Sequence, residues 1–102
     1  MNKFIKAAKK ADLENGKIKE IKIGNKIIAI ANIKDKYYAF DGLCIHIQCP
    51  LAGGYIKDHY IVCYCHGAQF DIETGEVKAT QAKTPLKIYK VKMKEEDIFV
   101  EI

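Results

Sequence analysis

Arginine and tryptophan are absent from this chain of 102 residues, so its 17 basic side chains are all lysine and its net charge is +4. Proteins that read nucleic-acid sequences favour arginine, because its planar fork of donors bonds guanine and phosphate at two points. The lysines are also spread along the chain, for example Lys3, Lys57 and Lys92, instead of forming one basic stripe. We therefore expect no nucleic-acid partner. A docking face for an acidic protein is the alternative to a simple solvated surface.

Long hydrophobic runs are also missing. The longest aliphatic stretch, Ile27 to Ala31, is far shorter than the roughly 20 residues that cross a bilayer. The opening MNKFIKAAKK contains neither the apolar core of a secretory signal nor a twin-arginine pair. These absences predict a soluble, cytoplasmic protein with no membrane span. The heavy use of isoleucine, lysine and glutamate, with few glutamines, is typical of a thermophile.

Short apolar runs separated by turn residues predict β-strands at 21–23, 26–33, 37–40, 60–62, 69–72, 86–93 and 98–102. Gly24-Asn25, Asp35-Lys36 and the left-handed position of Gly75 supply turns. The apolar phase of 86–93 slips once, which predicts a bulge near Tyr89. Residues 4–11 suit a helix as well as a strand. The length fits one domain, 1–102, and the strand spacing favours an all-β antiparallel sandwich or barrel.

The cysteines and histidines are gathered in two short groups, CIHIQCP at 44–50 and CYCHGAQF at 63–70. Four of them form Cys44-x-His46, sixteen intervening residues, and then Cys63-x-x-His66. Zinc accepts two cysteines and two histidines, whereas a 2Fe–2S cluster takes the cysteines on one iron and the histidines on the other. Zinc fingers pair cysteine with cysteine and histidine with histidine. The mixed groups here favour the cluster, with zinc as the alternative.

This pattern resembles the Rieske-type iron–sulfur ferredoxins, and the resemblance covers residues 4–102. Further shared landmarks are Pro50-Leu51-Ala52-Gly53-Gly54, His66-Gly67, Phe70-Asp71, Thr74-Gly75-Glu76-Val77, Pro85-Leu86 and Tyr89-Lys90-Val91. The resemblance implies a small antiparallel β-sandwich whose two ligand loops, residues 43–54 and 62–70, form a cluster-binding subdomain. It implies one 2Fe–2S cluster per chain, held by Cys44, His46, Cys63 and His66. It also implies that residues 4–11 form a strand.

The other two cysteines, Cys49 and Cys65, indicate a subtype. The resemblance implies a disulfide between them, as in the Rieske proteins of respiratory bc-type complexes; two free thiols in a reducing cytoplasm are the alternative. Those respiratory proteins also carry a serine and a tyrosine that donate to sulfur, where this chain has Ala68 and Phe70. The loss of these bonds destabilises the reduced cluster. We expect a midpoint below the respiratory proteins, within the range of about −150 to +300 mV.

These features predict a soluble one-electron carrier, not an enzyme, with no catalytic residue and no small-molecule substrate. Its partners are expected to be redox proteins, either a reductase or a terminal oxidoreductase. The alternative is a small subunit or ferredoxin component of a larger oxidoreductase, such as a nitrite reductase or an oxygenase. His59 is expected to be an exposed turn residue and no ligand. Leu51 is either an apolar docking contact or part of the core.

Overall fold

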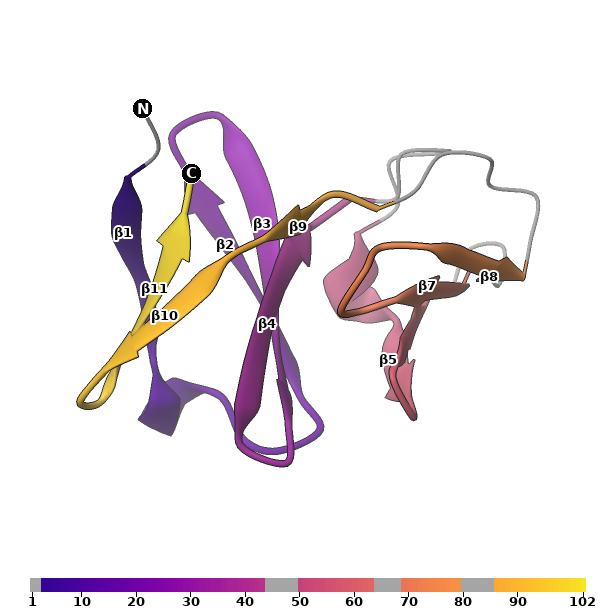
Figure 1. Ribbon diagram of the computed structural model, residues 1–102, viewed down its shortest axis with the longest axis horizontal. Helices are drawn as coiled ribbons and strands as arrows, with labels where there is room; N and C mark the ends of the chain where they lie inside the picture. Colours follow the sequence, from indigo (N-terminus) through magenta and orange to yellow (C-terminus); the bar gives the residue numbers. More distant parts are fainter. Residues whose placement is uncertain (1–2, 44–49, 64–68, 80–85) are drawn as a thin grey trace.

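The computed structural model describes residues 3–43, 50–63, 69–79 and 86–102, which form β-strands and two short 3-10 helices (Figure 1). The strands are β1 (Phe4–Lys9), β2 (Ile18–Ile23), β3 (Lys26–Ile33), β4 (Lys36–Asp41), β5 (Tyr55–Lys57), β6 (Tyr60–Val62), β7 (Gln69–Asp71), β8 (Val77–Ala79), β9 (Ile88–Tyr89), β10 (Val91–Lys94) and β11 (Asp97–Glu101). The helices are η1 (Lys10–Asp12) and η2 (Leu51–Gly53). The predicted all-β class is confirmed. Within these residues, no helix has the length and apolar character that a membrane span requires.

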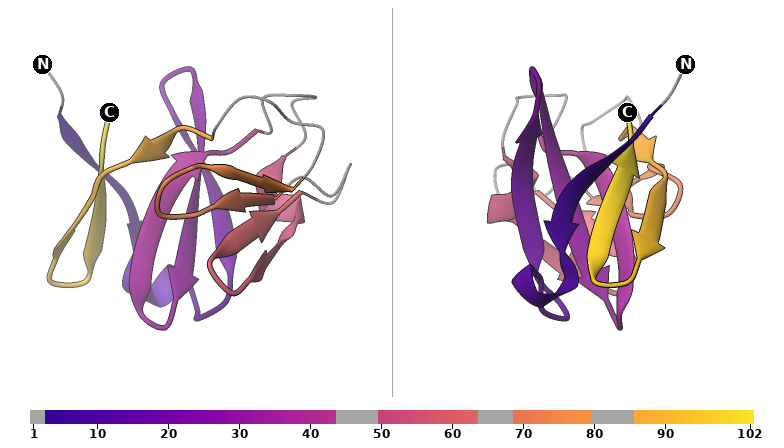
Figure 2. Two further views of the ribbon diagram at one scale, coloured as in Figure 1. Left: turned by 45° about the vertical axis from the view of Figure 1, so that its right-hand side comes forward. Right: turned by 90° about the vertical axis from the view of Figure 1, so that its left-hand side faces the viewer.

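The strands form three antiparallel sheets, ordered β1-β11-β10, β2-β3-β4-β9 and β5-β6-β7-β8. Figures 1 and 2 show the first two sheets packed against each other and the third beside them. Two clusters of buried hydrophobic side chains fill the spaces between the three layers. The predicted sandwich with an added small subdomain is therefore the observed architecture.

Strand β3 is buried on both faces, which explains its continuous apolar run. Ile28 and Ile30 pack in one cluster with Val100 of β11, whereas the alternate residues Ala29 and Ala31 pack in the other cluster. Successive side chains of a strand point to opposite faces, so a strand between two layers needs apolar residues at every position. The middle sheet thus carries the third sheet on one face and the β1-β11-β10 sheet on the other.

Two hairpin turns connect β2, β3 and β4. The Gly24-Asn25 turn is confirmed, since Ile23 pairs with Lys26 and Gly24 has a φ of 60°. The second turn lies at Lys34-Asp35, with φ values of 52° and 68°, so the prediction of Asp35-Lys36 is wrong by one residue. Positive φ at both central residues is typical of a type I′ hairpin turn. The side chain of Asn32 supports this turn, because its Oδ1 accepts a hydrogen bond from the Asp35 amide at 2.9 Å.

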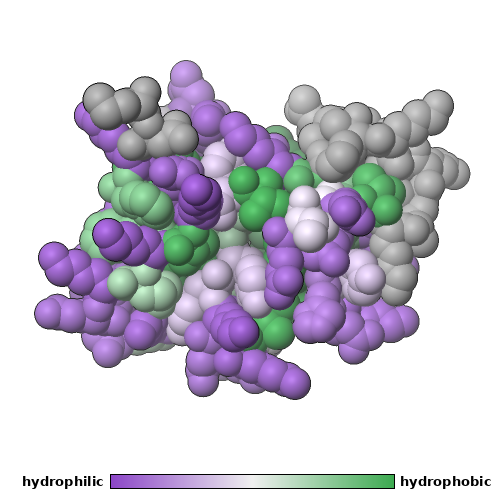
Figure 3. All heavy atoms as spheres, in the orientation of Figure 1, coloured by the Kyte–Doolittle hydropathy of each residue, from purple (hydrophilic) through white to green (hydrophobic). Residues whose placement is uncertain are grey.

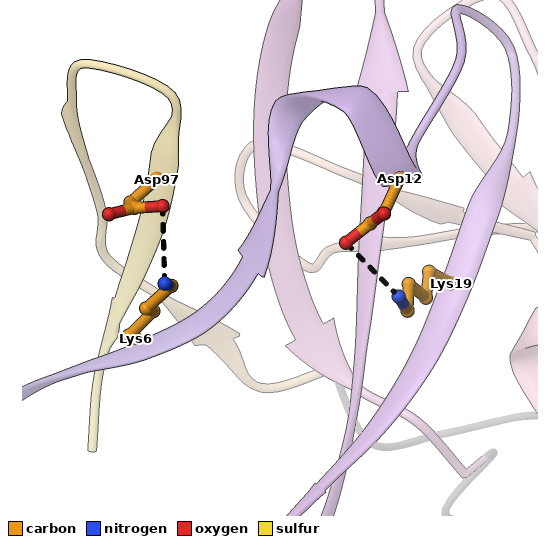
Figure 4. Close-up of polar contacts among 4 residues, drawn as sticks. All are labelled: Lys6, Asp12, Lys19 and Asp97. Carbon is orange, nitrogen blue, oxygen red and sulfur yellow. Dashed lines mark ion pairs between the residues drawn. The ribbon is translucent and has the colours of Figure 1, made fainter.

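The N-terminal segment is a strand from Phe4 to Lys9, as the family resemblance implies, and then turns into η1. It pairs with β11, and Lys6 approaches Asp97 at 3.4 Å across the pair (Figure 4). A second ion pair in Figure 4 joins Lys19 to Asp12 at 3.8 Å. Exposed ion pairs of this kind contribute at most about 1 kcal/mol. The strand pairing, more than these charges, fixes the N-terminal segment.

The C-terminal strand at 86–93 is two strands, β9 and β10, separated at Lys90. β9 pairs with β4, whereas β10 pairs with β11, so the chain passes from one sheet to another. Leu86 accordingly packs in the cluster that faces the third sheet, and Val91 packs in the opposite cluster. The predicted bulge near Tyr89 is therefore wrong, and the slip in apolar phase arises from the change of sheet.

The face of the molecule drawn in Figure 3 carries many hydrophilic residues. Figure 3 shows hydrophilic residues over much of this face, with hydrophobic residues in separate small groups among them. The largest exposed hydrophobic side chains among the described residues are Phe4, Ile5 and Tyr55. A solvated surface is thus the simplest account of most of the lysines.

Candidate metal centre

One of the four predicted ligands, Cys63, belongs to the described residues and directly follows β6. Its side chain is buried, with 0% of its surface exposed. Cys44, His46 and His66 lie outside the described residues, as do Cys49, Cys65 and Ala68. Cys63 and the residues where the two ligand loops begin and end therefore define the position of the candidate centre.

The base of the first loop is closed by backbone bonds. Leu43 and Pro50 form an isolated antiparallel bridge, and the Leu51 amide donates to the Gly42 carbonyl at 2.8 Å. Gly42 lies closely against Ile27, since a Cβ at this position would approach the Ile27 Cγ2 to 2.7 Å. Residues 43 and 50 thus lie side by side, so the segment that carries Cys44 and His46 leaves and rejoins the fold at one place.

The base of the second loop is the open end of a hairpin. β6 pairs with β7, and Val62 lies opposite Gln69. Cys63 follows Val62 directly, so the segment that carries Cys63 and His66 also begins and ends at one place. At the opposite end of β7, the turn to β8 has Gly75 at a φ of 82°, which confirms the predicted left-handed position.

The two loop bases adjoin each other. Tyr55, just after η2, pairs with Val62, just before Cys63. Gly54 is pressed against this strand, and an added Cβ would collide with the Val62 carbonyl oxygen. The chain that leaves the first loop therefore runs directly along the strand that enters the second loop. The fold therefore brings the bases of the two loops together at one end of the third sheet.

The surroundings of Cys63 are apolar. It shares a buried cluster with Leu51, Phe70 and Leu86, which come from three separate parts of the chain. Leu51 has no exposed surface, so of its two predicted roles the structure supports the core and excludes the exposed docking contact. These side chains keep water from the Cys63 thiol. A soft thiolate ligand in a dry pocket suits iron or zinc.

No alternative metal centre occurs in the described parts of the chain. Within residues 3–43, 50–63, 69–79 and 86–102, no three His, Cys, Asp or Glu side chains gather closely enough to hold a metal ion. A centre with three or more such ligands that includes Cys63 therefore needs at least one ligand from outside the described residues. Residues 44–49 and 64–68 contain the three remaining predicted ligands, so the donor set fits a centre with mixed nitrogen and sulfur ligands.

His59 lies apart from the candidate centre, as predicted. It is exposed in the turn between β5 and β6, at the opposite end of β6 from Cys63. With Asn15, Ile33, Lys34 and Asp58, it lines an open pocket of about 380 Å³. Its backbone carbonyl accepts a hydrogen bond from Ile72 at 2.8 Å. The backbone of His59 therefore stabilises the turn between β5 and β6. Its side chain is too far along β6 from Cys63 to suit a ligand of this centre.

Sequence reasoning missed one pair of residues next to the site. The Tyr89 hydroxyl donates to the Asp41 carboxylate at 2.7 Å, and Asp41 comes three residues before Cys44. The two residues are far apart in the chain, and pairing of β4 with β9 brings them together. The sequence offered two separate signals, the short spacing between Asp41 and Cys44 and the family landmark at Tyr89, but nothing that joined them.

Comparisons with known proteins agree with this geometry. Residues 3–90 match the family described as Rieske [2Fe-2S] domain. The chain is 30% identical over 97 residues to the ferredoxin component of biphenyl 2,3-dioxygenase from Rhodococcus jostii (strain RHA1), covering 95% of this chain and 91% of that protein. It is 34% identical over 88 residues to sulredoxin of Sulfurisphaera tokodaii, covering 78% and 81% of the two chains.

A solved structure is similar along nearly its whole length. The fold matches a chain from the complex of reduced oxygenase and oxidized ferredoxin in carbazole 1,9a-dioxygenase, with a TM-score of 0.88 and 26% identity. The match covers 95% of this chain and 91% of that one. The similarity therefore extends over nearly all of the fold.

Proposed function

The chain belongs to the Rieske [2Fe-2S] domain family, and on this premise we propose that it is a soluble one-electron carrier that serves as the ferredoxin component of an oxygenase system. The 2Fe–2S cluster is the cofactor of this family, and the related ferredoxin components are electron carriers rather than catalysts. We treat residues 1–102 as one Rieske domain with cluster-binding loops at 43–54 and 62–70. The family match over residues 3–90 supports this assignment.

We propose that Cys44, His46, Cys63 and His66 hold the cluster. The observation that carries this assignment is the contact of Gly54 with Val62, which joins the bases of the two loops beside a buried cysteine. When bound, the cluster would accept and release one electron, and two thiolates with two neutral imidazoles would leave it uncharged when oxidised. Leu51, as a buried neighbour of Cys63, excludes water from the thiolate and lowers the local dielectric constant.

The proposed partners are a reductase that supplies electrons and a terminal oxygenase that accepts them. The supporting observation is that relatives of this chain include ferredoxin components of biphenyl and naphthalene dioxygenase systems. The similar structure is also a complex of a ferredoxin with an oxygenase. The alternative is that the protein transfers electrons as a permanently bound small subunit of another oxidoreductase.

The purified protein tests this function directly. We expect a coloured protein whose visible absorption is bleached by a reductant, and a low-g paramagnetic signal in the reduced state. The reduced protein should pass one electron per chain to a Rieske oxygenase in a stopped-flow assay. A colourless protein that contains zinc would contradict the proposal, and recovery only in complex with a larger chain would favour the permanent subunit.

Substitution of Phe70 is expected to change the reduction potential of the cluster. Its side chain is 1% exposed and lies in the same buried cluster as Cys63. Replacing Phe70 by tyrosine is expected to raise the midpoint, because a hydroxyl that donates to a ligand sulfur stabilises the reduced state. A differential hydrogen bond of about 1 kcal/mol corresponds to about 40 mV in voltammetry. Phe99→Tyr, on β11 and outside this cluster, is the control; equal midpoints for both variants would contradict the prediction.

We also propose a disulfide between Cys49 and Cys65 in a cytoplasmic, thermophilic protein. The resemblance to respiratory Rieske proteins supports the bridge, and the lysine- and isoleucine-rich composition supports the thermophilic origin. Intracellular disulfides are common in hyperthermophiles. After acid removal of the cluster without reductant, an alkylating reagent is expected to label Cys44 and Cys63 alone. Mass spectrometry that shows all four cysteines labelled would contradict the bridge.

A further inference from the structure

The segment Leu86–Tyr89 connects the two ligand-loop hairpins through hydrogen bonds. The Leu86 amide donates to the Gly75 carbonyl at 2.7 Å, in the turn between β7 and β8. Gly75 is pressed against this segment, since an added Cβ would collide with the Leu86 carbonyl oxygen. One residue later, the Lys87 carbonyl accepts a hydrogen bond from the Asp41 amide at 3.0 Å. The segment therefore touches both the hairpin that follows the second loop and the strand that enters the first.

Tyr89 adds a side-chain bond to this connection. Its hydroxyl donates to Asp41 Oδ1 at 2.7 Å, and only 8% of the residue is exposed. A neutral hydroxyl that donates to a carboxylate in partly dry surroundings makes one of the stronger hydrogen bonds in proteins. Burial, together with the hydrogen bond and the charge of Asp41, raises the pKa of Tyr89 well above its ordinary value. The phenol thus remains a donor at all physiological pH values.

Two lysines complete the surroundings of Tyr89. The Lys87 ammonium lies 5.2 Å from the centre of the ring, and the Lys26 ammonium lies 5.7 Å from it. Both lysines are exposed, and Lys26 begins β3, an inner strand of the middle sheet. Cations over an aromatic ring contribute about 0.5–1 kcal/mol each at exposed sites. Side chains from β3, β4 and the C-terminal segment thus meet at this tyrosine.

The position of this group points to a role beyond general packing. A phenylalanine would fill nearly the same volume in the core, so what the hydroxyl adds among the described residues is its hydrogen bond to Asp41. Asp41 is followed by Gly42 and Leu43, whose backbones close the base of the first loop through Leu51 and Pro50. A displacement of Asp41 would therefore move the whole base of that loop.

We propose that Tyr89 and Asp41 are positioning residues, which hold the loop of Cys44 and His46 at a fixed place relative to the loop of Cys63 and His66. The proposal rests on the proposed function, because it gives the pair a role toward the ligands of the cluster. Neither residue touches the cluster in this role. They act through the backbone of residues 41–43 and through the segment Leu86–Tyr89.

The test compares Tyr89→Phe and Asp41→Asn with the wild-type protein, each loaded with its cluster. Tyr37→Phe is the matched control, because Tyr37 lies at the other end of β4 and its hydroxyl accepts a long hydrogen bond of 3.4 Å from Asn32. For Tyr89→Phe we expect the cluster to be lost about tenfold faster, the rate change that corresponds to about 1.4 kcal/mol. The paramagnetic signal of the reduced variant should also broaden, because the ligands take up a wider range of positions.

A change in hydrogen exchange that is confined to the first ligand loop and its base distinguishes a positioning role from a general loss of stability. Hydrogen exchange of the loaded Tyr89→Phe protein, followed by mass spectrometry, should rise in residues 41–54 and stay unchanged in β1 and β11. Asp41→Asn retains an acceptor for the hydroxyl, so we expect a smaller rise in cluster loss of about threefold. This variant decides the question if Tyr89→Phe does not fold.

Two results would overturn the proposal. One is cluster loss and spectra in both variants that match the wild type and Tyr37→Phe. The other is exchange that rises equally in all strands, which would show a merely structural role. A wild-type protein without an iron–sulfur signal would contradict the proposed function instead, so the two failures are distinguishable.

Discussion

Replacing Cys63 by alanine is expected to leave a chain that holds no 2Fe–2S cluster. Alanine has no sulfur ligand, and the site has 0% exposure, so water cannot readily take the place of the thiolate. The same result is expected for His46→Ala and His66→Ala, because each removes one of four ligands. Iron and acid-labile sulfide, measured per chain after anaerobic purification, should fall close to zero, and the visible absorption should disappear.

The neighbouring Val62→Ala variant controls for packing. Val62 is 4% exposed and directly precedes Cys63, but its side chain contains no metal ligand. Its truncation removes two buried methyl groups at a cost of about 2 kcal/mol, which is more packing than Cys63→Ala removes. We expect this variant to keep its cluster. A Cys63→Ala protein with unaltered iron content and spectrum would show that the ligand assignment is wrong.

Replacing Gly54 by alanine is expected to separate the two ligand loops. The added Cβ would collide with the Val62 carbonyl oxygen, which belongs to the backbone of β6 and has no flexible side chain to move aside. The start of β5 must then move away from β6, and the pair Tyr55–Val62 is lost. We expect the free energy of unfolding to fall by about 1–3 kcal/mol and the iron content to fall with it.

Gly24→Ala is the matched control for this variant. Gly24 lies in the turn between β2 and β3, and no atom comes within 4 Å of a Cβ placed there. Its φ of 60° makes alanine unfavourable by about 1 kcal/mol without any collision. Cluster content close to that of the wild type is therefore expected for Gly24→Ala. Equal losses in the two variants would contradict the close contact of the loops.

Much of the local structure followed from neighbouring residues in the sequence. Gly24-Asn25 fixed one hairpin, and Gly75 fixed another, because few residues other than glycine adopt a left-handed backbone easily. The prediction for Asp35-Lys36 missed by one residue because Lys34 takes a left-handed conformation that its type does not announce. The strand at 86–93 was predicted as one element, since nothing in its local pattern distinguishes a bulge from a change of sheet.

The sequence by itself identified the family, because the order and spacing of its cysteines and histidines can be read along the chain. The same spacing predicts Cys44, His46, Cys63 and His66 as the ligands. Only the tertiary structure decided that Leu51 is core, that β3 is buried on both faces and that Asp41 bonds Tyr89. Those outcomes depend on which sheets pack together and where β9 joins β4. Contacts between distant segments arise from burial of apolar surface in three layers, and a one-dimensional pattern does not specify which layers meet.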